Sequence, residues 1–292
     1  MSRLLPLAAA LFALALRAGS PAASPEALLE GLEHRLHGRI GVAAVDTGTG
    51  HRLEYRAQTR FPMCSTFKVL LVGKVLARVD RGECRLDQPL AFGPGDLLAW
   101  APVTRRRVGE GSMPVADLCA AALETSDNTA ANLLLRASGG PPAVTAFART
   151  LGDPTTRLDR LEPALNEVLP GDPRDTTTPE AMLGTLRALL LGPALQPASR
   201  ARLEAWMRAC TTGRDALRAA LPADWVAGDK TGSGGRGTTN DLAILRPPGR
   251  APILVAAYLT GTEAPPEART AALAEVGRIV LRALGFRNGA SR

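Results

Sequence analysis

Hydrophobic and polar positions follow strand spacing near both ends of this chain and helical spacing in its middle. Residues 25–36 predict an amphipathic helix, and residues 40–46 and 51–55 predict two strands joined by a Gly-rich hairpin. From residue 64 to about residue 206 the pattern is helical, broken by loops rich in Gly and Pro at 93–114, 139–142 and 152–178. Strand spacing then returns at 225–229, 240–245 and 253–258, before a last predicted helix at 266–284.

Strands at both ends with helices between them predict an α/β (α+β) fold. The two terminal segments are expected to complete one antiparallel sheet flanked by helices, with an all-helical lobe inserted between them. We place the α/β lobe at residues 24–61 plus 208–292 and the helical lobe at 62–207, together forming a single catalytic domain, 24–292. The boundary between two lobes is a favoured place for an active site.

The first 23 residues have the pattern of a secretory signal peptide. Arg3 precedes an apolar stretch from Leu4 to Leu16, and small residues follow up to Ala23. This stretch is too short to span a bilayer comfortably, and no later run approaches the roughly 20 apolar residues that a membrane helix needs. We therefore expect an exported, periplasmic protein that has no membrane anchor and acts as a monomer.

Charge and composition narrow the possible partners. The net charge of +7 falls to +5 without the leader, which carries two arginines and no acid. The positive charge is spread along the chain and aromatic residues make up only 4%, so the basic stripe with interleaved aromatics of a nucleic-acid binder is missing. The spacing of the four cysteines predicts no structural disulfide, and His34 and His37 are interpreted as an exposed pair rather than metal ligands.

Lysine is rare in this chain, which contains three lysines against 32 arginines. Two of the three lie in residues 65–68 (Ser-Thr-Phe-Lys) and 229–232 (Asp-Lys-Thr-Gly), close to hydroxyl groups. A buried ammonium can lose its proton at physiological pH, whereas a guanidinium cannot. The use of lysine at these two places therefore indicates proton-transfer chemistry.

Ser65 begins a run of apolar residues that predicts a buried helix, and Lys68 follows three residues later. The two side chains share one helix face, so the amine can reach the hydroxyl. Unpaired backbone N–H groups at a helix start favour developing negative charge. Burial and a second cation would lower the lysine pKa enough for it to accept the serine proton. Alone, Ser-x-x-Lys is weak evidence, since about one match is expected by chance in a chain of this size.

Two further motifs carry hydroxyl, amide and ammonium groups. Residues 126–128 (Ser-Asp-Asn) lie in a predicted break between helices, where Ser126 could relay a proton and Asn128 could donate to an amide carbonyl. The same residues could simply cap the next helix. Residues 230–234 (Lys-Thr-Gly-Ser-Gly) are predicted to end a strand, and their free N–H groups, hydroxyls and lysine suit an amide substrate that bears a carboxylate. An ordinary hairpin turn would have a similar sequence.

In this order the three motifs are a set found in class A β-lactamases and penicillin-binding proteins. The chain resembles a class A serine β-lactamase over nearly its whole length after the leader. Residues 157–166 (Arg-Leu-Asp-Arg-Leu-Glu-Pro-Ala-Leu-Asn) resemble the ω loop of that family, with Arg160 and Asp175 placed to pair across its neck. The resemblance implies a cis peptide between Glu162 and Pro163. It also implies hydrolysis of penicillins and cephalosporins, and hence antibiotic resistance, without metal or organic cofactor.

The resemblance also implies a role for each site residue. Ser65 is expected to be the nucleophile, with the N–H groups of Ser65 and Ser233 forming the oxyanion hole. Lys68, or Glu162 through a bound water, takes the serine proton; the family leaves this choice open. Glu162 then activates that water, held also by Asn166, to hydrolyse the acyl-enzyme.

The remaining roles concern proton delivery and substrate binding. Ser126 is expected to pass a proton toward the lactam nitrogen, with electrostatic support from Lys230. The small-molecule β-lactam is expected to contact Trp100, Asn128, Thr231, Gly232 and Ser233. For Trp100, core packing is an equally good interpretation.

This sequence departs from the family pattern in three places, one of which is Val72 at the position that pairs with Cys119 in another family disulfide. Many members supply an arginine for the substrate carboxylate where this chain has Thr239, and Arg269 or Arg236 would have to replace it. Some carbapenem-hydrolysing members have a cysteine where Gly234 stands, so Cys64 cannot form the disulfide seen in them. We therefore expect useful turnover of cephalosporins and poor turnover of carbapenems.

Two alternative functions share the three motifs. The first is a penicillin-binding D-Ala-D-Ala peptidase, which normally lacks the loop with Glu162 and Asn166 and is usually tethered to the membrane. The second is a non-hydrolysing β-lactam sensor domain, which would acylate and stop there.

Overall fold

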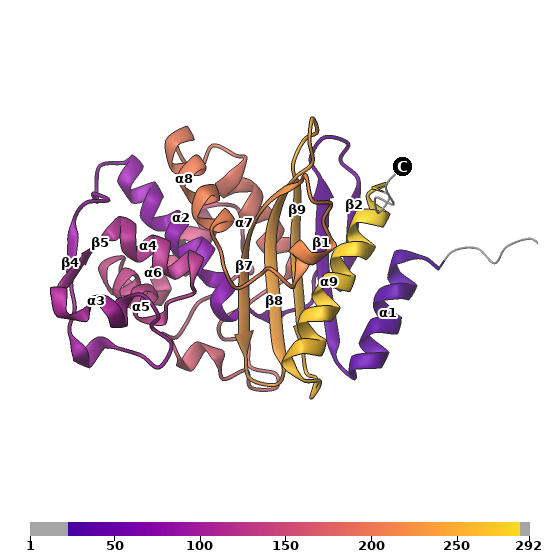
Figure 1. The fold of residues 1–292 in the computed structure, drawn as a ribbon, viewed down its shortest axis with the longest axis horizontal. Coiled ribbons are helices and arrows are strands. Elements are labelled where there is room, and N and C mark those ends of the chain that lie inside the picture. Colours follow the sequence, from indigo (N-terminus) through magenta and orange to yellow (C-terminus); the bar gives the residue numbers. More distant parts are fainter. Residues whose placement is uncertain (1–22, 287–292) are drawn as a thin grey trace, which may run out of the picture.

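The structure is a computed structural model that describes residues 23–286 (Figure 1). The predicted signal peptide lies outside these residues, except for Ala23. A five-stranded antiparallel sheet has the order β2-β1-β9-β8-β7. Its strands are β1 (Arg39–Asp46), β2 (Arg52–Tyr55), β7 (Val226–Gly234), β8 (Thr238–Arg246) and β9 (Ile253–Thr260). The sheet thus joins both ends of the chain, as the sequence predicted.

Both faces of the central strands are covered, so their side chains divide between two apolar layers. Alternate residues of β9 such as Val255 and Leu259 pack toward α1 (Pro25–Leu36) and α9 (Pro266–Ala283). The residues between them, such as Leu254 and Tyr258, face the second layer together with α2 (Phe67–Asp80) and α7 (Pro179–Leu190). A strand buried on both faces reads as a continuous apolar run, which β9 shows from Ile253 to Leu259.

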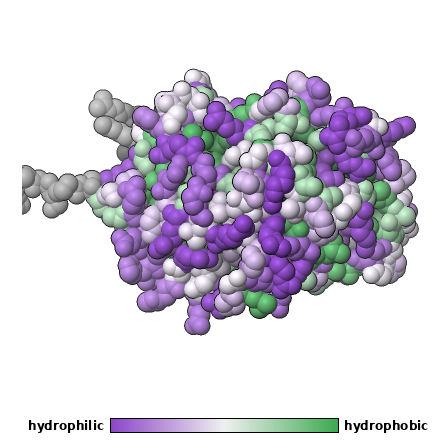
Figure 2. All heavy atoms as spheres, turned by 180° about the vertical axis from the view of Figure 1, so that it is seen from behind, coloured by the Kyte–Doolittle hydropathy of each residue, from purple (hydrophilic) through white to green (hydrophobic). Residues whose placement is uncertain are grey.

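The helical lobe lies beside the β7 edge of the sheet, opposite the edge near α1 (Figure 1). Its other helices are α3 (Thr104–Arg107), α4 (Val115–Glu124), α5 (Asn128–Ala137), α6 (Gly140–Thr150) and α8 (Pro197–Arg208). Short strand pairs join β3 (Phe61–Pro62) to β6 (Thr176–Thr177) and β4 (Pro89–Ala91) to β5 (Ser112–Pro114). Seen from behind, the surface is mostly hydrophilic, and hydrophobic residues form small scattered groups (Figure 2). Within residues 23–286, no helix has the length and hydropathy needed to cross a bilayer.

Several predicted boundaries need correction. The strand predicted to stop at residue 229 continues to Gly234, because β8 pairs with it from Val226↔Arg246 to Gly234↔Thr238. Residues 139–142 were predicted as a loop, but α6 already begins at Gly140, since prolines are tolerated in the first helical turn. The predicted loop 93–114 contains the four-residue helix α3, short 3-10 turns and β5.

Candidate active site

Ser65 lies at the floor of a cleft of about 360 Å³ whose wall includes the edge strand β7 and the loop between α4 and α5. A 3-10 turn, Cys64–Thr66, carries it directly into α2. This places Ser65 in the first turn of a helical segment, where backbone N–H groups lack intrahelical acceptors. The residue is 8% exposed, so its hydroxyl meets the cleft while the rest of the turn is buried.

Lys68 contacts residues from three of the candidate motifs. Its fully buried Nζ lies 3.0 Å from Ser65 Oγ, 3.2 Å from Ser126 Oγ and 2.6 Å from Asn128 Oδ1. Glu162 Oε1 is 3.2 Å from the same nitrogen. Burial lowers the pKa of Lys68, and the charge of Glu162 opposes that shift. The amine therefore lies within hydrogen-bond reach of the serine in an environment that favours its neutral form.

Asp127 holds the loop residue Ser126 and the first residue of α5, Asn128, in place. As the N-cap of α5, the buried Asp127 carboxylate accepts a bond from Ala130 N and also binds the backbone and hydroxyl of Thr104. The capping interpretation of this motif is thus correct, and it is compatible with a functional one. Ser126 has a φ of 60°, a conformation that non-glycine residues adopt rarely and that is common at functional sites.

Glu162 reaches the cleft from the ω loop. Its Oε1 accepts a 3.3 Å bond from Ser65 Oγ, and its Oε2 accepts one of 2.5 Å from Asn166 Nδ2. Asn132 binds the Glu162 backbone twice, through Oδ1 to the N–H and through Nδ2 to the carbonyl. Sequence reasoning missed Asn132, although a polar residue four positions after Asn128 on an apolar helix shares its face.

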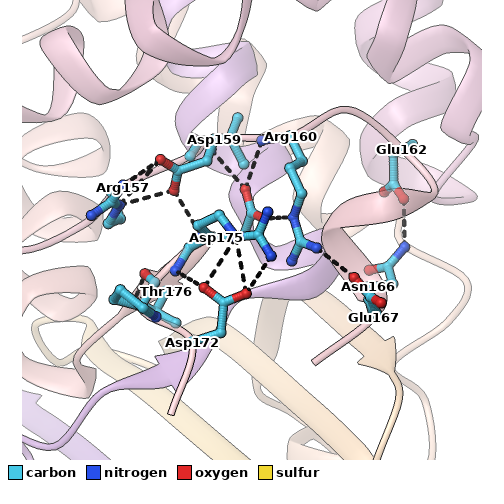
Figure 3. A network of polar contacts seen from close by, with 12 residues as sticks. Arg157, Asp159, Arg160, Glu162, Asn166, Glu167, Asp172, Asp175 and Thr176 are labelled. Carbon is cyan, nitrogen blue, oxygen red and sulfur yellow. Dashed lines mark hydrogen bonds and ion pairs between the residues drawn. The ribbon is translucent and has the colours of Figure 1, made fainter. Parts of the chain in front are cut away.

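The neck of the ω loop closes as predicted. The Asp175 carboxylate is buried and accepts bonds from Asp159 N at 2.7 Å, Arg160 N at 3.0 Å and Arg160 Nε at 2.6 Å (Figure 3). Arg160 also pairs with Glu167 at 2.8 Å. The peptide bond between Glu162 and Pro163 is cis, which confirms that prediction.

The β7 wall supplies the second lysine. Lys230 Nζ donates to Ser126 Oγ at 3.1 Å and to the Thr231 carbonyl at 2.8 Å. Burial, followed by repulsion from Lys68, lowers the pKa of Lys230 to about 8. Gly232 allows β7 to approach the turn Cys64–Thr66, since a Cβ there would lie 3.2 Å from Ser65 N. Ser126 thus lies within hydrogen-bond reach of both lysines.

Behind Lys230 the sheet contains buried charge that the sequence analysis missed. Asp229 and Asp241 are diagonal neighbours on β7 and β8, and both are fully buried. Arg218 pairs with Asp229, and Leu217 N donates to Asp241 at 3.2 Å. Burial raises the pKa of both carboxyls, and for Asp241 the charge of Asp229 adds to the rise.

Some of the other candidate site residues line the cleft and others lie outside it. Trp100 is 56% exposed and lines the cleft, with its Nε1 donating to Thr125 O, so its interpretation as a core residue was wrong. Thr239 lines the cleft, but Arg236 and Arg269 do not. The four cysteines are free. Within residues 23–286, no cluster of three or more metal-ligating side chains is present.

Comparison with known proteins agrees with this geometry. A profile of the "Beta-lactamase enzyme family" matches residues 26–284. Beta-lactamase CTX-M-25 from Escherichia coli is 50% identical over 252 residues, 86% of each chain. The Carbapenem-hydrolyzing beta-lactamase KPC from Klebsiella oxytoca is 46% identical over 255 residues, 87% of each chain. The structure of an ancestral class A β-lactamase is 60% identical, with a TM-score of 0.87, over 89% of this chain and 100% of that one.

A serine held between a buried lysine and a glutamate, in a cleft beside an antiparallel sheet, defines a serine hydrolase that works through an acyl-enzyme. With the family match over nearly all of the described residues, the chain belongs to the class A serine β-lactamases. It hydrolyses β-lactam antibiotics and thereby confers resistance to them.

Proposed function

We propose that Ser65 opens the lactam ring and that Lys68 accepts its proton. The observation that carries this proposal is the position of Ser65 Oγ, 3.0 Å from Lys68 Nζ and 3.3 Å from Glu162 Oε1. The N–H groups of Ser65 and Ser233 stabilise the oxyanion, which the close approach of β7 to the nucleophile turn supports. Lys68 was one of two candidate bases, and its lowered pKa favours it.

In this proposal Ser126 protonates the leaving nitrogen of the lactam. Its hydroxyl lies 3.2 Å from Lys68 Nζ and 3.1 Å from Lys230 Nζ, so a proton taken from Ser65 has a short path through Lys68 to Ser126. A cationic Lys230 stabilises charge at this hydroxyl. Glu162 and Asn166 then hold the water that hydrolyses the acyl-enzyme, consistent with their 2.5 Å contact.

The substrate carboxylate is bound by hydroxyl groups and the charge of Lys230, without a contacting arginine. Thr231 and Thr239 line the cleft, as does Thr212, whose Oγ1 lies 2.5 Å from Thr231 Oγ1. None of the residues lining this cleft is an arginine. Ser233 completes the carboxylate contact, Asn128 and Ser233 bind the acyl amide, and Trp100 and Gly232 form the adjoining walls.

We further propose that cephalosporins are hydrolysed well and carbapenems poorly. Gly234 leaves the β7 edge unbridged, with Cys64 as a free thiol beside it. A relative at 50% identity is a CTX-M enzyme, while one at 46% is named for carbapenem hydrolysis. Steady-state kinetics with one cephalosporin and one carbapenem test this specificity, and equal kcat/KM values would contradict it.

Sustained turnover is what separates this function from its alternatives. A chromogenic cephalosporin should be consumed over many cycles, because Glu162 and Asn166 are in place for deacylation. A D-Ala-D-Ala peptidase or a sensor domain would give one equivalent of product and stop. Ser65→Ala is the matched control and should give neither a burst nor turnover.

The remaining proposals concern the location, oligomeric state and domain organisation of the enzyme. We propose export to the periplasm through residues 1–23, a monomeric state, and one catalytic domain over 24–292 with the lobes divided at residues 62 and 207. Cell fractionation, mass measurement of the mature chain and sedimentation analysis test these three points.

A further inference from the structure

A second concave surface lies below the ω loop and shares no lining residue with the cleft at Ser65. This cavity has a volume of about 480 Å³. Its walls come from the ω-loop segment 168–174, the segment 37–39 at the start of β1, the segment 59–62 before the nucleophile turn, and the ends of the β7–β8 hairpin and of β9. The cavity therefore joins the ω loop to the sheet.

Positive charge dominates the lining. Five arginines and one histidine contribute, against a single acid, Asp172. The basic residues are His37, Arg39, Arg60, Arg160, Arg174 and Arg236. Arg174 pairs with Asp172, and Arg160 pairs with Asp175 and Glu167. The other three arginines have no carboxylate partner among residues 23–286.

Two of these three arginines are held in place without being neutralised. Arg60 donates to Thr176 Oγ1 at 3.0 Å. Arg39 donates to the Arg60 carbonyl at 3.1 Å, and its guanidinium lies 4.7 Å from the centroid of the Phe61 ring. Burial and then repulsion from Arg56 lower the pKa of Arg39. Neutral groups therefore fix the positions of these two guanidinium groups, and their positive charge remains available to an anion.

The backbone around the cavity is unusual at three lining positions. His37, Val168 and Arg236 have φ values of 47°, 57° and 53°, a region that L residues avoid and that is a genuine outlier for a β-branched side chain. Arg236 sits in the β7–β8 turn, where its carbonyl accepts bonds from Gly261 N at 2.8 Å and Thr262 N at 3.2 Å. Such strain persists where the surroundings enforce it, and it clusters at binding sites.

We propose that this cavity binds a compact, polyvalent oxyanion of the phosphate type, held by Arg39, Arg60 and Arg236. Guanidinium groups bind phosphate oxygens through paired N–H donors, which gives both charge and direction. The anion would connect the β7–β8 turn to the start of β1 and to the segment before β3, and it would lie against the wall formed by residues 168–174. Its binding would therefore restrain the ω loop without occupying the substrate cleft.

Calorimetric titration of the protein with inorganic pyrophosphate tests the site. We expect saturable binding of one anion, weakened roughly 10-fold in Arg236→Gln and in Arg39→Gln, since one charge-assisted bond contributes about 1.5 kcal/mol. Arg106→Gln is the matched control, because Arg106 is exposed, lies outside the cavity and has no carboxylate partner within the described residues. The thermal melting of each variant shows that it is folded.

Two results would overturn the proposal. One is the absence of saturable binding to the folded wild-type protein. The other is equal weakening by Arg106→Gln and Arg236→Gln, which would mean that pyrophosphate responds only to overall charge. Hydrogen exchange gives an independent readout, since pyrophosphate should slow exchange in 168–174 in the wild type and not in Arg236→Gln.

A lipid headgroup presents the same phosphate chemistry, so a second experiment distinguishes the sources. The protein is sedimented with phosphatidylglycerol vesicles, with and without pyrophosphate. Binding to vesicles that pyrophosphate displaces, and that Arg236→Gln lacks, assigns the site to a membrane headgroup. Binding of pyrophosphate without vesicle association assigns it to a soluble anion.

Discussion

Replacing Glu162 with alanine should separate the two halves of the reaction. The Glu162 side chain is fully buried, and its carboxylate contacts Ser65, Lys68 and Asn166 at once. Its removal leaves the deacylating water without a base, and general-base assistance is worth roughly 10²- to 10⁴-fold. This corresponds to about 2.7 to 5.5 kcal/mol in the barrier to deacylation.

Acylation should survive this change. The charge of Glu162 holds the pKa of Lys68 up against desolvation, so its loss lets that pKa fall further. A larger fraction of Lys68 is then neutral and able to accept the Ser65 proton, through a contact of 3.0 Å that does not involve Glu162. The variant should therefore accumulate as a covalent acyl-enzyme.

Intact-protein mass spectrometry after mixing with a penicillin measures this directly. Glu162→Ala should carry one penicilloyl mass, wild type should be unlabelled at steady state, and Ser65→Ala should never be labelled. Glu167→Ala is the matched control, since this neighbouring glutamate pairs with Arg160 and its side chain is 54% exposed. Deacylation of Glu162→Ala at the wild-type rate would refute the mechanism, and failure to acylate would transfer the role of acylation base from Lys68 to Glu162.

Five further outcomes are expected. Lys68→Arg keeps the charge but cannot give up its proton, so the pre-steady-state burst should collapse by roughly 10²-fold or more; an unchanged burst would make this lysine a purely electrostatic support. Arg160→Ser leaves the buried Asp175 carboxylate without its ion-pair partner, which should cost about 3 kcal/mol of unfolding free energy in urea and speed hydrogen exchange across the ω loop. Lys230 loses its charge as pH rises through about 8, so kcat/KM should fall there, and Lys230→Arg should move that alkaline limb upward. Because the unfolded chain keeps this proton to higher pH, the Lys230 contribution to the free energy of unfolding should rise with pH above about 8. Thr239→Arg adds a guanidinium to the cleft lining and should lower the penicillin KM several-fold; an unchanged KM would place the carboxylate elsewhere.

The architecture was largely predictable because hydrophobic spacing is a local property. The helix predicted over 25–36 has those bounds, and the last helix ends one residue earlier than predicted. The end of β7 was mispredicted, because glycine-rich residues 232–234 have weak strand preference and are held in the strand by pairing with β8. Pairing between strands depends on residues distant in the sequence, which a local pattern cannot report.

The search for an arginine that binds the substrate carboxylate shows the same limit of local sequence patterns. Sequence spacing made Arg236 and Arg269 equal candidates to replace the arginine missing at Thr239. In the fold, Arg236 lies in the β7–β8 turn and lines the second cavity, while Arg269 lies on α9 outside the cleft lining. Which cavity each arginine lines depends on the packing of these elements, which sequence spacing does not report.

The sequence by itself determined which chemistry this protein can perform. Two lysines kept among 32 arginines, each close to a hydroxyl, indicate proton-transfer chemistry. The resemblance of the Glu-Pro segment ending in asparagine to the ω loop of the family implies groups that hold a water. The sequence gives each residue type directly, so these inferences do not depend on the tertiary structure. Tertiary structure decided how the groups act, because Lys68 meets Glu162 and Ser126 only after the ω loop and the α4–α5 loop close over it. It also determined their charges, since burial, which lowers the pKa of Lys68 and Lys230, is a property of the packed molecule and not of any segment.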